Sequence, residues 1–182
     1  IAYDSPQFVP DENYLGGHPT PAYNGTGAAL RARAVHATGY YPFHFFRSWL
    51  ELFLCTRLRD AGWEVRYFPE LEVWHRRPSG SINRPVTYHG LRNYFWYVWT
   101  CYPSTPAIRE TLHHLGFCSR MMLSGRLSVA LFSHAWIDAC AGLGRILKER
   151  KPISKDTLDY LQRVRRFDND YGIVQSRRQF AL

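Results

Sequence analysis

Apolar positions change their spacing about halfway along the chain, from a mixed pattern to a helical one. The first half predicts two helices, at 31–38 and 48–62, and short strands at 28–30, 65–68 and 71–75. The second half predicts four helices, near 86–101, 105–122, 124–149 and 154–166. We therefore expect an α/β fold over residues 1–84, followed by a basic amphipathic helical tail over residues 85–182.

Charge is divided unevenly between these two halves. Residues 1–83 hold eight basic and eight acidic side chains, whereas residues 84–182 hold fifteen and seven, which accounts for the net charge of +8. A basic half suits nucleic acid, anionic lipid or a phosphorylated ligand, and a solvated basic face has the same composition. The sequence carries no nucleic-acid-binding motif, so we expect no nucleic-acid partner.

Cysteine usage and hydropathy bear on the location of the protein. The four cysteines are widely spaced with no Cys-x-x-Cys pair, which argues against a zinc site and favours free thiols in a reducing compartment. No apolar run approaches the roughly 20 residues that span a bilayer. We expect a cytoplasmic location and leave open a peripheral contact with the inner face of the plasma membrane.

Glu51 is the first candidate for chemistry. It follows Ser48 by three residues at the start of the helix predicted over 48–62, beside the apolar stripe of that helix. A carboxylate there can serve as a general base for an acceptor hydroxyl. The same spacing is that of a capping box, in which the glutamate bonds the backbone of Ser48, and this alternative stays open.

Other candidates come from strand ends, arginines and a glycine-rich turn. His75 ends the strand predicted over 71–75, where an imidazole suits a divalent ion, although a structural histidine fits equally. Arg84 and Arg92 carry the planar guanidinium that suits a diphosphate, or they belong to a solvated basic edge. Asn24-Gly25-Thr26-Gly27 is a turn signal but only a weak phosphate-loop signal, because a third glycine is lacking.

Taken in order, these segments resemble the C-terminal half of family-2 glycosyltransferases, particularly rhamnosyltransferase-like members. The likeness covers about residues 24–103 and rests on the order and spacing of several elements. They are the turn and apolar stretch from Asn24 to Ala32, Gly39-Tyr40-Tyr41-Pro42 with Phe45-Phe46, the helix ELFLCTRLRDAG from Glu51, the paired strands WEVRYFPELEVWH ending in His75, the segment Ser79 to Arg84, and Leu91-Arg92-Asn93.

The resemblance implies a partial GT-A fold with a Rossmann-like mixed sheet, a nucleotide-sugar donor, and a divalent metal, Mn²⁺ or Mg²⁺. It implies direct displacement with inversion at the anomeric carbon. Glu51 then takes the position of the general base, His75 lies near the metal and diphosphate, and Arg84 neutralises the leaving group. The resemblance assigns substrate binding to the remaining candidates, which are Asn24, Gly25, Thr26, Gly27, Trp49 and Arg92.

Two departures from the family pattern limit the resemblance. Leu50 and Phe53 stand where relatives often carry acidic or amide side chains, and no Asp-x-Asp lies upstream of Gly25. We therefore expect a fragment of an inverting glycosyltransferase that acts on a cell-envelope or lipid-linked glycan. The alternative is a non-catalytic binding or scaffold module derived from the same fold.

Overall fold

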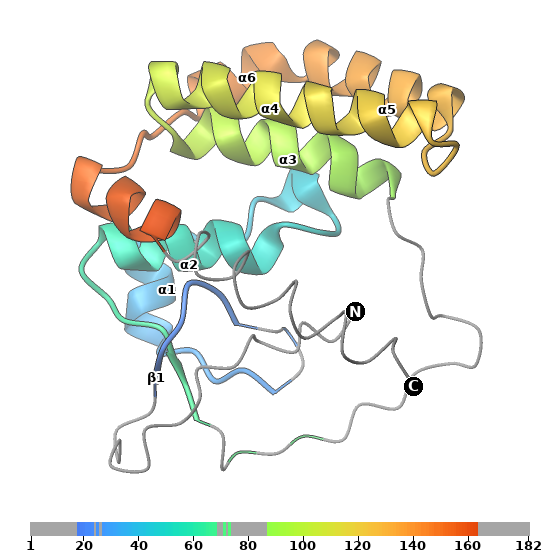
Figure 1. The fold of residues 1–182 in the computed structure, drawn as a ribbon. Helices are drawn as coiled ribbons and strands as arrows, with labels where there is room; N and C mark the ends of the chain where they lie inside the picture. The colour runs from blue at the N-terminus through green and yellow to red at the C-terminus, as the bar shows by residue number, and fades with distance from the viewer. Residues whose placement is uncertain are drawn as a thin grey trace. The chain divides into compact units, whose positions relative to one another are not determined.

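A computed structural model describes residues 18–23, 25, 27–68, 71, 73 and 87–163. The chain divides into two compact units, each of which is continuous in space but not in sequence (Figure 1). Unit 1 is drawn from residues 1–40, 54–83 and 154–182, and unit 2 from residues 41–53 and 84–153. Each unit is described by itself below.

Unit 1 packs short elements around a small apolar core. Its elements are β1 (His18–Pro19), α1 (Ala32–Thr38), the part of α2 (Leu50–Asp60) from Leu54 onward, β2 (Arg66–Tyr67) and a helical segment over 155–163. The core consists of Ala34, Leu54 and Leu58, with Tyr23, Val35, Trp63 and Val65 packed against it. Because these side chains come from α1, α2 and the segment after α2, the core joins pieces that are distant in sequence.

Glycines and a side-chain cap mark the ends of three helical elements of unit 1. Gly39 follows α1 with φ 77° and Gly62 follows α2 with φ 81°, and glycine adopts such positive φ values without steric cost. The backbone amide of Ser154 donates to Asp60 Oδ1 at 2.7 Å, and Ser154 Oγ accepts from the amide of Thr157 at 3.3 Å. The second bond is an N-cap, which starts the helical segment at 155.

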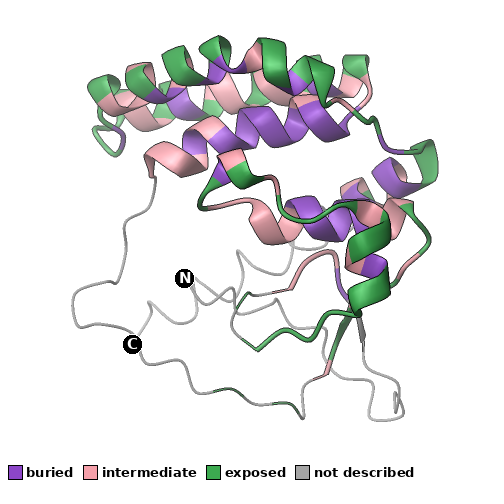
Figure 2. Ribbon diagram, turned by 180° about the vertical axis from the view of Figure 1, so that it is seen from behind, coloured by how far each residue is buried: buried purple, intermediate pink, exposed green. Residues whose placement is uncertain are grey.

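Unit 2 is a helical assembly built around one central helix. It holds the 3₁₀ turn η1 (Phe43–Phe45), α3 (Tyr88–Cys101), α4 (Ser104–Leu123), α5 (Val129–Ala141) and α6 (Leu143–Lys148). Helix α3 contacts α4, α5 and α6, and Figure 1 shows α3, α4 and α5 side by side. Figure 2 shows α3 buried along most of its length, whereas α4 and α5 turn exposed residues outward. The aromatic sequence of α3 therefore forms the core of this unit.

A close approach between α3 and the α5–α6 junction sets the packing of unit 2. Trp96 Nε1 donates to the carbonyl oxygen of Ala139 at 3.0 Å. A Cβ atom placed on Gly142 would lie 2.5 Å from Trp96 Cζ2. Glycine at position 142 therefore lets the backbone approach the indole ring directly.

The predicted α/β fold with a GT-A mixed sheet is wrong for the described residues, which are mostly helical. The only pairing among them is the antiparallel match of His18–Pro19 with Arg66–Tyr67. Residues 28–30, predicted as a buried strand, are exposed and have no regular structure. Short apolar runs identify a strand only when a partner strand supplies hydrogen bonds, and 28–30 has no such partner among the described residues. The strand predicted over 65–68 contains β2, and most of the strand predicted over 71–75 lies outside the described residues.

The helix predictions are largely confirmed, with two changes. Helices α1, α3 and α4 and the helical segment at 155–163 lie where helices were predicted, but the predicted helix over 124–149 is two helices that meet at Gly142. Helix α2 begins at Leu50, and Ser48 has φ 65°, outside the extended conformation of an N-cap residue. The capping-box alternative for Glu51 is therefore not supported.

Candidate functional site

A strained loop leads into the helix that carries Glu51. Phe46, Ser48 and Trp49 have φ of 56°, 65° and 67°, and they are the positive-φ residues other than glycine in the described part of the chain. Bulky side chains rarely adopt this conformation, which costs on the order of 1–3 kcal/mol for each residue. Three such residues within four positions require strong external support, and all of them lie in unit 2.

Asn93, from the second turn of α3, supplies part of that support. Its side chain is fully buried, and Nδ2 donates to the carbonyl oxygen of Phe45 at 2.7 Å and to that of Ser48 at 3.2 Å. The same nitrogen also donates to the carbonyl oxygen of Arg47. An amide nitrogen carries two hydrogens, so three carbonyls share them. One side chain thus ties down the backbone on both sides of Phe46.

Arg92 supplies the rest of the support. Its Nη2 donates to the carbonyl oxygens of His44 at 3.2 Å and Phe45 at 3.5 Å. The guanidinium lies 4.2 Å from the Trp96 ring centroid and 5.2 Å from that of Tyr88. Cation–π stacking of this kind holds the planar group in place while it bonds the loop.

Trp49 fixes the end of the loop against α3. Its Nε1 donates to the carbonyl oxygen of Gly90 at 2.8 Å. The indole stacks on Tyr97, with centroids 5.9 Å apart and planes 16° apart, and it also meets Tyr94 at 4.9 Å. The indole is therefore engaged in packing within unit 2, directly before α2 begins.

Glu51 lies two residues beyond Trp49, in the first turn of α2, and is half-buried. The free amides at a helix N-terminus favour a negative side chain at this position. Its carboxylate has no hydrogen bond or ion pair with the residues that the structure describes. Glu51 therefore combines a fixed backbone with a carboxylate that is free to accept a proton from a ligand.

His44, on the other side of the loop, is a buried base that the sequence interpretation missed. Its side chain is only 5% exposed, and Nε2 lies 3.8 Å from Glu149 Oε2. Burial lowers the pKa of His44; Arg145 and Arg92 lower it further, while Glu149 opposes the shift. Nδ1 has no hydrogen-bond partner among the described residues. Burial therefore favours the neutral form of the His44 imidazole, which packs 5.4 Å from the Trp96 ring.

The remaining predicted site residues lie elsewhere or outside the described part of the chain. Gly25 is exposed in unit 1, and Gly27 has φ 83° with Val73 where a Cβ atom would be. Gly27 thus meets the demand of a tight turn, as predicted for this segment. The predicted residues outside the described ranges are Asn24, Thr26, His75 and Arg84.

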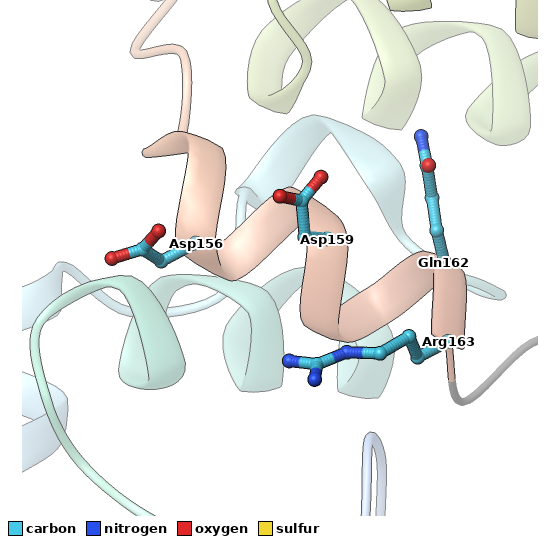
Figure 3. A pocket seen from close by; sticks show the side chains of 4 residues that line it. All are labelled: Asp156, Asp159, Gln162 and Arg163. Atoms are coloured by element: carbon cyan, nitrogen blue, oxygen red, sulfur yellow. The ribbon is translucent and has the colours of Figure 1, made fainter.

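No cluster of three potential metal ligands occurs among the described residues. The predicted ligand His75 lies outside the described residues. The described helices include none that is both long and apolar enough to cross a membrane. An open surface hollow lies along one face of the helical segment 155–163 (Figure 3). It is lined by Asp156, Asp159, Gln162 and Arg163, and none of these was predicted as a site residue.

The structure brings Glu51, Trp49 and Arg92 together in unit 2, where Trp49 and Arg92, predicted to bind substrate, make packing contacts. The sequence does not single out Asn93 as a functional residue. Its one signal was an amide in an otherwise aromatic helix, because a buried polar side chain must find partners. Comparison of the chain with protein-family models, with curated proteins and with solved structures finds no match.

Proposed function

We propose that this chain is part of an inverting glycosyltransferase that moves a sugar from a nucleotide-sugar donor to a cell-envelope or lipid-linked glycan. The observation that carries the proposal is that Glu51 lies in the first turn of α2, directly after the strained loop of residues 46–49. Strained backbone is kept where a reacting group needs a fixed position. The sequence resemblance gives the reaction class, and the geometry supports Glu51 as the reacting residue.

In the proposed reaction Glu51 takes the proton of the acceptor hydroxyl as that oxygen attacks the anomeric carbon. The bond between this carbon and the nucleoside diphosphate breaks at the same time, and the configuration inverts. A carboxylate without a partner among the described residues is suited to this role, because accepting the proton breaks no hydrogen bond to them. A divalent metal, when bound, would stabilise the charge on the departing diphosphate.

Asn93 and Arg92 act in this proposal as positioning residues. They donate to the carbonyl oxygens of residues 44, 45, 47 and 48 and thereby fix where α2 begins. General acid–base catalysis requires the base within about 3 Å of the proton that it removes. A loop that relaxed by an ångström would therefore separate Glu51 from the acceptor while leaving its carboxylate intact.

One observation favours the non-catalytic alternative. Trp49 and Arg92 were both expected to bind substrate, but their side-chain N–H groups donate hydrogen bonds within unit 2. A binding module that had lost catalysis would keep such a packed framework without needing Glu51. The two functions therefore differ in whether Glu51 matters.

Replacement of Glu51 separates them. The full chain would be mixed with Mn²⁺, UDP- and dTDP-sugars and a polyprenyl-linked glycan, and release of UDP or dTDP measured. Glu51→Gln should lower release by about 10²–10⁴-fold, the usual contribution of a general base. Glu64→Gln is the matched control, because Glu64 is an exposed carboxylate paired with Arg66.

Three results are informative. Loss of release in Glu51→Gln alone, with binding of UDP or dTDP by calorimetry retained, supports the proposal. Equal release by Glu51→Gln and the unaltered chain excludes Glu51 as the base. Binding of the glycan without any release, in a sample with the far-ultraviolet signal of a helical protein, favours the binding module.

A further inference from the structure

The turn between α4 and α5 presents an apolar surface that no described residue covers. Leu123, the last residue of α4, is 90% exposed, the highest value of any large apolar side chain in the described part of the chain. Val129, the first residue of α5, is 64% exposed. Figure 2 shows the connection between them almost wholly exposed. We call residues 120–130 the hairpin tip.

The hairpin tip has an ordered backbone. Gly125 has φ 69°, and the amides of Arg126 and Leu127 both donate to the carbonyl oxygen of Met121, at 2.9 and 3.1 Å. Leu127 is 4% exposed and belongs to a core cluster with Leu91, Cys118 and Ala135. Burial of Leu127 therefore anchors the turn, while Leu123 and Val129 on either side are left in solvent.

Charge at the hairpin tip has one sign. From residue 111 to residue 137 the fully charged side chains are Arg120 and Arg126, and no carboxylate occurs in this stretch. Both arginines are exposed. The nearest carboxylates along the chain are Glu110 and Asp138, which accept hydrogen bonds from Tyr94 and Tyr88. Leucine and valine flanked by arginines that have no ion pair with a described residue form the pattern of a segment that sits at an anionic lipid surface.

We infer that the hairpin tip docks on an anionic bilayer, with Leu123 and Val129 entering the acyl boundary and Arg120 and Arg126 meeting lipid phosphates. The arginine stems cover apolar surface while their guanidinium groups stay at headgroup level. A lipid-linked acceptor would then be delivered on the same surface. The inference concerns binding alone and goes beyond the proposed transfer reaction.

Co-sedimentation with vesicles tests the inference. The full chain would be incubated with phosphatidylcholine vesicles that contain either 30% phosphatidylglycerol or none, and the bound fraction measured at low and high salt. Preferential, salt-sensitive binding to the anionic vesicles is expected. Arg120→Gln with Arg126→Gln should lower the partition coefficient about 30-fold, since each arginine near such a surface contributes about 1 kcal/mol.

Leu123→Glu should lower the partition coefficient at least tenfold, because part of a leucine burial energy of about 1.5–3 kcal/mol is lost. Ile108→Glu is the matched control, because Ile108 is 51% exposed on the same helix and lies about 22 Å from Leu123 at 1.5 Å per residue. This variant should bind the vesicles like the unaltered chain. Circular dichroism checks that every variant keeps its helices.

Equal binding to both vesicle types, or an unchanged partition coefficient in Leu123→Glu, would overturn the inference. So would self-association in sedimentation velocity that disappears in Leu123→Glu without any vesicle binding, because the hairpin tip would then be a contact between copies of this chain. Failure of vesicle binding would leave the Glu51 transfer assay unaffected, so the two proposals fail separately.

Discussion

Replacing Asn93 by alanine should release the strained loop without unfolding the helices of unit 2. The variant loses the hydrogen bonds from Nδ2 to the carbonyl oxygens of Phe45, Arg47 and Ser48. With two amide hydrogens, the loss amounts to about two bonds at about 1 kcal/mol each, and the small cavity at a fully buried position adds about 1 kcal/mol. We expect a decrease of about 3 kcal/mol in the free energy of unfolding.

Two assays measure this effect. Urea unfolding followed by circular dichroism gives the global free energy. Trypsin cleavage after Arg47 reports the loop itself, and a 3 kcal/mol decrease in the local opening free energy should speed cleavage by roughly 100-fold when opening and closing are fast. The strain at Phe46, Ser48 and Trp49 adds to the tendency to open once the bonds are gone.

Asn93→Asp separates hydrogen bonding from volume. The side chain keeps its size, but a carboxylate has only acceptor oxygens to offer the three carbonyls, so the loss should equal or exceed that of alanine at pH 7. Thr100→Val is the matched control on α3, since the Thr100 hydroxyl donates to the carbonyl oxygen of Trp96 within the same helix. Two results together would refute a supporting role of Asn93. The free energy of unfolding of Asn93→Ala would lie within about 0.5 kcal/mol of the unaltered chain, as for neutral surface changes, and trypsin would cleave after Arg47 no faster.

Three further predictions concern other contacts of unit 2. Gly142→Ala should lower the free energy of unfolding in urea by about 1–3 kcal/mol, because the new Cβ would overlap the Trp96 ring. A Cβ atom at Gly144 meets nothing within 4 Å, so Gly144→Ala should stabilise its helix, and equal effects of the two changes would contradict this packing. Burial lowers the pKa of His114 from 6.5 to about 4, so the unfolded chain binds more protons than the folded one between these pH values. The free energy of unfolding should therefore fall by up to about 3 kcal/mol from pH 7 to pH 4. His114→Gln should lose that part of the pH dependence, and an unchanged pH profile in this variant would exclude His114 as its source. Arg92→Lys should cost about 1–2 kcal/mol and speed trypsin cleavage of the loop, since an ammonium cannot stack and bond two carbonyls together; stability equal to the unaltered chain would show that charge alone suffices.

The helices could be predicted from the sequence because their causes are local. The 3.6-residue period of α3 and α4, the proline before α4 and Gly39 after α1 each act within a few residues. The strands were predicted less well, because a strand depends on a partner elsewhere in the chain: the prediction over 65–68 contains β2 (Arg66–Tyr67), but the prediction over 28–30 is wrong. Ala28, Ala29 and Leu30 form an apolar run, yet the structure leaves them exposed and unpaired.

The loop before Glu51 could not be predicted for a related reason. Nothing in the local sequence of Phe46, Ser48 and Trp49 favours positive φ, which glycine or asparagine usually provides. The conformation is imposed by Arg92 and Asn93, more than 40 residues further along the chain. Candidate residues chosen by type alone therefore include those that build the site as well as those that act in it.

Hydrogen-bond use distinguishes residues that build the loop from a residue that is available to a ligand, and Arg92 is of the first kind. Nε donates to Asn93 Oδ1 at 3.1 Å, Nη1 to the hydroxyl of Tyr88 at 3.3 Å, and Nη2 to two loop carbonyls. A guanidinium has five N–H groups, so few remain to bind a diphosphate bidentately. The carboxylate of Glu51 is the opposite case, because none of its acceptor sites is used by the described residues. In the proposed reaction the proton transfer is therefore assigned to Glu51, and Arg92 and Asn93 are assigned to the loop that precedes it.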